Sequence, residues 1–92
     1  MNKLEECRKR IDEIDTKIIE LYEQRMDVVK EVTNYKLENG LNVLDSSREA
    51  AMLEKNTEKV QSQEYKKYYK NVLDGFLKSS KDMQHEIMNK NK

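Results

Sequence analysis

The sequence has no proline, no tryptophan, two glycines, one cysteine and one histidine among its 92 residues. A lone cysteine, Cys7, cannot form an internal disulfide, and together with a lone histidine, His85, it cannot build a tetrahedral zinc site. The same shortage argues against Cys-His and Ser-His-Asp nucleophilic catalysis. Because proline and glycine, the two residues least compatible with a helix interior, are so scarce, the composition is typical of an all-helical chain.

An excess of charge of one sign and long apolar runs are missing as well. Lys and Arg number 18, and Asp and Glu number 18, so no net positive field would attract phosphate. No apolar run approaches the roughly 18 residues of a membrane span, and the charged start is unlike a signal peptide. These features predict one cytoplasmic domain over residues 1–92 that binds neither nucleic acid nor membranes.

Residues 3–38 carry one long helical pattern. Apolar side chains recur every seven residues in two series. The first series is Leu4, Ile11, Ile18 and Val32, and it is interrupted by an arginine at position 25. The second series is Cys7, Ile14, Leu21, Val28 and Tyr35. Such a seam is typical of a helix that packs against another along its whole length. Asn39 and Gly40 end the pattern, because both tolerate the left-handed conformation found at helix C-termini.

Two further helices are expected, at about 46–60 and 64–88. Ser46 and Glu49 have capping-box spacing at the start of the first of these, and Asp45 stands just before it. The long helix would measure about 54 Å, whereas a compact chain of this size is about 30 Å across, so its seam needs a partner chain. The sequence therefore predicts an all-α fold, with one long, one short and one medium helix per chain in an intertwined homodimeric helical bundle.

Three cations are placed unusually. Arg25 lies in the apolar seam, where it must meet a carboxylate, a polar ligand or water, or else set the register of a coiled coil. Lys36 lies three turns later on the same face, with Val29 and Val32 between, so that face suits an anionic small molecule; a lysine there also simply favours the helix dipole. Arg8 lies about 25 Å from Arg25 along the helix, so a shared small ligand would require Arg8 of the opposite subunit.

Two clusters of polar residues, one at the start of the second helix and one in the third helix, complete the candidate site. Asp45, Arg48 and Glu49 cluster at the start of the second helix, where capping alone could explain the two carboxylates. Ser80 and Gln84 sit one turn apart within the apolar stripe of the third helix. A buried Ser-Gln pair needs hydrogen-bond partners from a neighbouring helix or from a ligand.

Together these residues resemble the all-helical chorismate mutases, a family of small homodimeric enzymes of the shikimate pathway. The resemblance runs from Leu4 to about Ile87, and its motifs are Arg8-x-x-Ile11-x-x-Ile14-Asp15 with Gln24-Arg25 and Tyr35-Lys36, then Asp45-x-x-Arg48-Glu49, then Ser80-x-x-x-Gln84. No single motif is specific, but all three at these separations are.

The resemblance implies an isomerase that converts chorismate to prephenate by a Claisen rearrangement, in phenylalanine and tyrosine biosynthesis, with no metal or cofactor. Catalysis would rest on Arg25, Lys36 and Gln84, with Lys36 and Gln84 holding the ether oxygen whose bond breaks. The implied substrate contacts are Arg25, Arg8 from the partner chain, Arg48 and Ser80 for the two carboxylates, and Glu49 with the backbone of Asp45 for the ring hydroxyl.

Two other functions stay open. An isochorismate–pyruvate lyase on the same scaffold would bind a similar dianion with the same cations. A non-catalytic helical dimer that binds another pathway enzyme would explain the seam equally well, but it would not explain Arg25 and Lys36 on one face or the Ser80–Gln84 pair. Association of an active mutase with another shikimate-pathway enzyme is also left open by the sequence.

Overall fold

The computed structural model describes residues 2–91 and forms three helices there, with no strand. They are α1 (Lys3–Glu38), α2 (Ser46–Lys59) and α3 (Gln63–Lys90). The prediction of an all-α chain with one long, one short and one medium helix is confirmed. Relative to the expected ranges, α2 stops one residue earlier, while α3 begins one residue earlier and continues two residues further.

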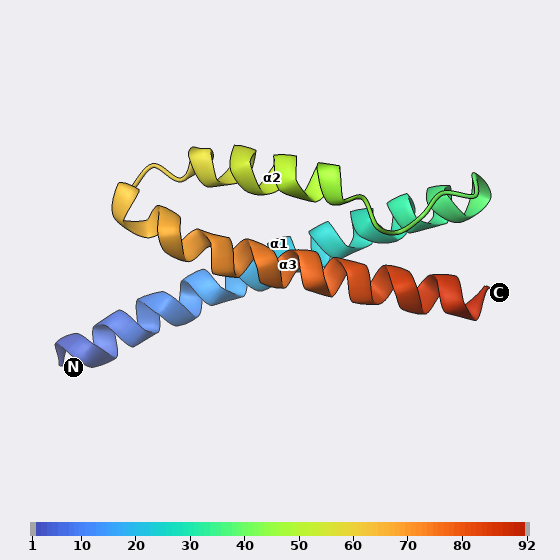
Figure 1. Cartoon of the computed structure of the whole chain (residues 1–92). Coiled ribbons are helices and arrows are strands. Elements are labelled where there is room, and N and C mark those ends of the chain that lie inside the picture. The colour runs from blue at the N-terminus through green and yellow to red at the C-terminus, as the bar shows by residue number, and fades with distance from the viewer. Residues whose placement is uncertain (1, 92) are drawn as a thin grey trace.

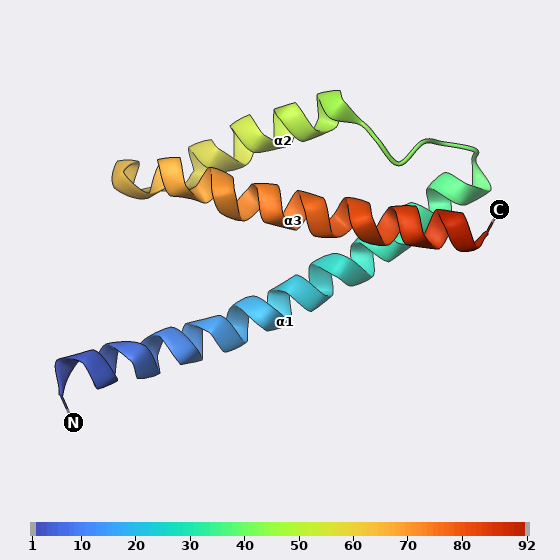
Figure 2. The ribbon, with the colours of Figure 1, turned by 60° about the horizontal axis from the view of Figure 1, so that its bottom comes forward.

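The helices α2 and α3 form an antiparallel hairpin, and the long helix α1 crosses it. α2 runs back along α3, and α1 crosses α3 and then diverges from it toward the N-terminus (Figures 1 and 2). α3 therefore packs against both other helices and forms the centre of the chain. The molecule measures 55 × 26 × 15 Å, and its longest dimension matches the length expected for the first helix.

The end of α1 follows from a single glycine. Gly40 has a φ of +63°, and it places the Leu41 N–H 2.8 Å from the Lys36 carbonyl and the Gly40 N–H 3.4 Å from that of Leu37. This is the Schellman arrangement, in which a left-handed residue satisfies the last helical carbonyls. The expected stop is confirmed, although Asn39 itself keeps a negative φ of −109°.

The cap of α2 differs from the expectation. Asp45, not Ser46, is the N-cap residue, and its Oδ1 accepts hydrogen bonds from the Arg48 backbone N–H at 3.0 Å and the Ser47 hydroxyl at 2.9 Å. Ser46 is already the first helical residue, so the predicted capping box with Glu49 does not form. The side chain of Glu49 is thereby free for another contact.

The buried interior of the chain is small and largely polar. Its buried side chains are the apolar Leu73 and Val43 and the polar Thr33, Ser80 and Gln84. By contrast, the apolar seam of α1 lies on the outside, with 53% of Ile11, 55% of Ile14 and 63% of Leu21 exposed. The radius of gyration, 16.7 Å, is well above the value of about 12 Å expected for a compact chain of this length.

Candidate active site

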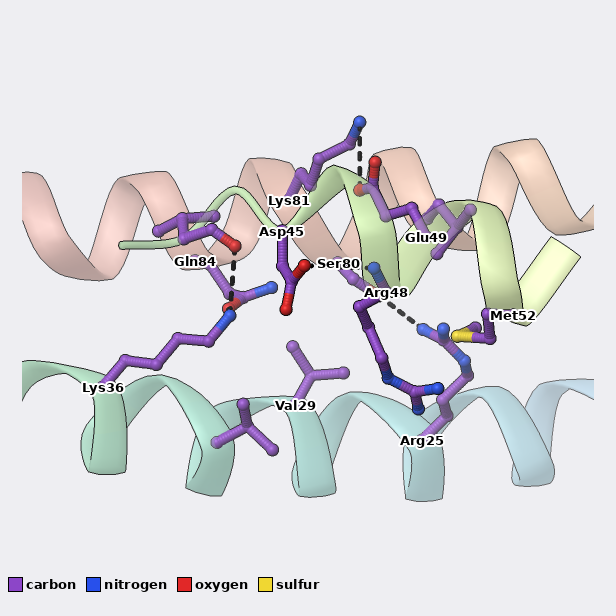
Figure 3. Close-up of a pocket in the computed structure, with 13 residues that line it drawn as sticks. Arg25, Val29, Lys36, Asp45, Arg48, Glu49, Met52, Ser80, Lys81 and Gln84 are labelled. Carbon is purple, nitrogen blue, oxygen red and sulfur yellow. Dashed lines mark hydrogen bonds and ion pairs between the residues drawn. The ribbon is translucent and has the colours of Figure 1, made fainter. Parts of the chain in front are cut away.

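A pocket of about 130 Å³ lies where α3 faces the C-terminal half of α1 and the start of α2 (Figure 3). It is lined by Arg25, Val29, Val32 and Lys36 from α1, by Val43, Asp45, Arg48, Glu49 and Met52 from the connection and α2, and by Leu77, Ser80, Lys81 and Gln84 from α3. Seven of the eight site residues predicted from the sequence meet here. The exception is Arg8, which does not line the pocket of its own chain.

Helical periodicity explains the α1 wall. Arg25, Val29, Val32 and Lys36 are spaced by four, three and four residues, which places all four side chains on one face. The two cations stand at the ends of this stripe, and both valines line the pocket. Figure 3 shows Val29 between Arg25 and Lys36. A ligand with separated polar groups around an apolar ring would match this alternation.

Arg25 finds its polar partner on α3. Its guanidinium donates a hydrogen bond to the Ser80 hydroxyl, and that hydroxyl in turn donates to the Phe76 carbonyl at 2.9 Å. The guanidinium also lies 5.7 Å from the centre of the Phe76 ring, a cation–π contact, and Phe76 stacks on Tyr22 at 6.3 Å. Arginine has five N–H groups, so it keeps donors for an anion in the pocket.

Lys36 and Gln84 form the opposite end of the pocket. The Lys36 ammonium donates to the Gln84 Oε1 at 3.1 Å and to the Val43 carbonyl at 3.0 Å. Because the amide oxygen of Gln84 accepts from Lys36, its NH₂ group points into the pocket (Figure 3). An ammonium has three donors, so Lys36 retains a third one beside the Gln84 amide. A charged donor, the Lys36 ammonium, and a neutral donor, the Gln84 NH₂ group, therefore face the same end of the pocket.

Asp45 is committed to the helix cap. The hydrogen bond from the Arg48 backbone lowers the pKa of Asp45, as do the hydrogen bond from Ser47 and the charges of Lys36 and Arg48. The carboxylate thus stays ionised at neutral pH with its Oδ1 engaged by the backbone and the hydroxyl of its own helix turn. This cap fixes the first turn of α2 and with it the positions of Arg48 and Glu49.

Lys81 lines the pocket and was missed by the sequence interpretation. Its ammonium lies 3.3 Å from Glu49 Oε1, which links α3 to α2 across the upper rim of the pocket (Figure 3). The available signal was its spacing, since Lys81 precedes Gln84 by three residues and shares its side of α3. In a helix with many exposed lysines, that spacing alone did not distinguish it.

The charges of the lining suit a dianion. Four cationic side chains, those of Arg25, Lys36, Arg48 and Lys81, face two carboxylates, those of Asp45 and Glu49, so the pocket carries a formal charge of about +2.

Within residues 2–91 no group of three or more His, Cys, Asp or Glu side chains is placed to hold a metal ion. None of the three helices is long and apolar enough to cross a membrane.

Comparison with known proteins agrees with these features. The sequence profile of the family described as chorismate mutase type II matches residues 7–85. A chorismate mutase of Methanocaldococcus jannaschii is 43% identical over 49 residues, which are 53% of this chain and 50% of that protein, so the chain spans about half the length of this curated relative. Since the profile covers most of the chain and every residue of the pocket, the chain belongs to the chorismate mutase type II family.

Proposed function

We propose that this chain is a chorismate mutase, which rearranges chorismate to prephenate on the route to phenylalanine and tyrosine. The observation that carries the proposal is the pair of donors, Lys36 and Gln84, held together at one end of a cationic pocket whose other end holds Arg25 and Ser80. Chorismate has two carboxylates and a bridging ether oxygen, and these three groups need cations and donors in such an arrangement.

The reaction makes few chemical demands on the protein. A Claisen rearrangement breaks the C–O bond of the ether while a C–C bond forms, and it uses no nucleophile and no proton transfer. The enzyme must hold the substrate in the folded, reactive conformer, which is catalysis by proximity and orientation. It must also stabilise the negative charge that develops on the ether oxygen as the bond lengthens, and preorganised donors in a pocket do this efficiently.

Each side chain then has a role in this scheme. Arg25 and Arg48 bind carboxylates of the substrate. The Ser80 hydroxyl, which donates to the Phe76 carbonyl in the free pocket, rotates toward the carboxylate at Arg25 and donates to it. Lys36 and the Gln84 NH₂ group donate to the ether oxygen. These last two interactions strengthen in the transition state, so they contribute mainly to kcat, whereas the arginines also lower KM.

Glu49 takes the remaining polar group of the substrate. Its carboxylate accepts a hydrogen bond from the ring hydroxyl, beside the backbone of Asp45, at the α2 wall of the pocket. Because the cap of α2 is supplied by Asp45, the Glu49 side chain is available for this contact.

We also propose that the active unit is a homodimer in which each pocket receives Arg8 from the partner chain. Two observations support this: the seam of α1 is exposed along most of its length, and Arg8 lies about 25 Å from Arg25 on the same helix. An antiparallel pairing of two α1 helices would cover the seams and bring Arg8 of one chain toward the pocket of the other. Sedimentation velocity of the purified chain should give twice the chain mass of 11.0 kDa.

The test of the function is to identify products. The purified chain is incubated with chorismate and, separately, with isochorismate, with an Arg25→Ala variant as the control for contaminating activities. Prephenate from chorismate, lost in the variant, supports the proposal. Salicylate and pyruvate from isochorismate with little prephenate would replace it with a lyase, and a folded protein that turns over neither substrate would leave only a binding role.

A further inference from the structure

We propose that Lys81 is a positioning residue: it fixes the Glu49 carboxylate at the wall of the pocket so that Glu49 can accept the substrate's ring hydroxyl. The inference rests on the proposed function and adds to it a residue that neither the sequence motifs nor the family resemblance assigns. Its basis is the 3.3 Å contact between Lys81 Nζ and Glu49 Oε1, the one ion pair between helices in the described part of the chain.

The placement of Lys81 on α3 separates its role from those of its neighbours. Ser80 and Gln84 are buried and hydrogen-bond to Arg25 and Lys36, so they tie α3 to α1. Lys81 instead reaches toward α2, where its side chain keeps 36% exposure and that of Glu49 keeps 25% (Figure 3). The ammonium engages Oε1 of Glu49, which leaves Oε2 for a hydroxyl donor.

Glu49 needs such a restraint because its side chain lies between two cavities and can point into either. A second, more open cavity of about 480 Å³ lies beside the pocket, and Glu49, Leu77 and Lys81 line both. The ion pair therefore forms part of the wall between the two cavities. Without Lys81 the glutamate side chain could rotate into the outer cavity, where water would solvate its charge, and the hydroxyl of the substrate would lose its acceptor.

Charge gives a second reason for the pair. A carboxylate in a site that binds a dianion repels its own substrate, and this repulsion acts at short range in a partly enclosed pocket. The ammonium of Lys81 balances the Glu49 charge from the side away from α1. Glu49 can then accept a hydrogen bond from the substrate without opposing its binding.

The test is a double-mutant cycle on kcat/KM for chorismate, with Lys81→Met made in the natural chain and in a Glu49→Gln chain. If Lys81 acts through Glu49, the lysine replacement lowers kcat/KM by about tenfold in the natural chain and by less than twofold beside Glu49→Gln. Lys81→Arg restores at least half of the lost activity, because it keeps a cation within reach of the carboxylate.

Lys78 supplies the matched control. It lies one turn from Lys81, lines only the outer cavity and pairs with Asp82 at 2.8 Å, so Lys78→Met should leave kcat and KM unchanged. Equal losses from Lys81→Met in both backgrounds would overturn the proposal and assign Lys81 a direct substrate contact. No loss in either background would also overturn it.

Two further measurements keep the outcomes distinct. Circular dichroism checks that each variant is folded, and Lys81→Gln replaces Lys81→Met in the cycle if the latter is not. Turnover by the unmodified chain is measured first, because absence of prephenate there refutes the proposed function itself. Normal turnover with an additive cycle refutes only the role of Lys81.

Discussion

Replacing Gln84 by glutamate should confine the proposed mutase activity to acidic pH. The Gln84 amide accepts from Lys36 through Oε1 at 3.1 Å and presents its NH₂ group to the pocket, so it donates at any pH. A carboxyl group in its place donates only when protonated. Loss of one donor to a developing oxyanion lowers kcat by about 10²–10³, or roughly 2.7–4 kcal/mol, and this range sets the loss expected at neutral pH.

The pH dependence follows from the titration of the introduced carboxyl group. Its ordinary pKa is about 4.3, and the neighbouring Lys36 ammonium favours its charged form, so the protonated fraction falls about tenfold for each pH unit above that value. At pH 7.5 Gln84→Glu has only the roughly 10⁻²–10⁻³ of natural activity that remains without the donor. At pH 5.5 about 6% of a carboxyl group with the ordinary pKa is protonated, so the activity relative to the natural chain should rise by at most about 6- to 60-fold between these two pH values.

The assay is the initial rate of chorismate consumption across this pH range for three proteins. Gln84→Met is the control, because it offers no donor at any pH and its activity relative to the natural chain should not vary. A constant ratio for Gln84→Glu as well would refute the donor role assigned to the amide. A parallel rise in both variants would trace the effect to another titrating group.

Two other predictions address the dimer and the α2 cap. Inactive Arg8→Ala and Arg25→Ala chains, mixed equally and allowed to exchange, should recover about a quarter of natural activity, because half of the dimers are mixed and each has one intact pocket. Formation of mixed dimers without recovered activity would refute the shared site. The cap stabilises the chain above the unfolded pKa of Asp45, ordinarily 3.8, and this contribution is lost as pH falls through the lowered folded value. Asp45→Ala should therefore lower the melting temperature more at pH 7 than near pH 2.5, and an equal effect at both would contradict this origin.

Local sequence rules were sufficient for the helices. The heptad pattern and the Gly40 stop define α1 because both depend on residues a few positions apart, and the absence of proline allows the helix to continue for 36 residues. Arg25, Lys36, Ser80 and Gln84 could be singled out for a related reason, since each is a polar residue on an otherwise apolar face. That the four converge on one site was implied by the family resemblance.

The N-cap of α2 and the role of Lys81 could not be predicted from the sequence, because both depend on residues that are neighbours only in the folded chain. Asp45 and Ser46 are both good N-cap residues, and the choice between them depends on how the connection from Gly40 enters α2. Lys81 is one of many lysines in α3, and only the packing of α2 against α3 brings Glu49 within 3.3 Å of it. Such contacts between helices leave no periodic trace in either segment.

The crossing of α1 and α3 also has a consequence for biosynthesis. Arg25 and Ser80 are 55 residues apart in the sequence. At typical elongation rates of 5–20 residues per second, the ribosome therefore adds Ser80, on the helix that completes the pocket, about 3–11 s after Arg25. The exposed apolar side chains nearer the N-terminus of α1, among them Ile11, Ile14 and Leu21, need no later part of the chain in order to pair. In the proposed homodimer, neighbouring nascent chains on one polysome can therefore join through α1 before either has completed its pocket.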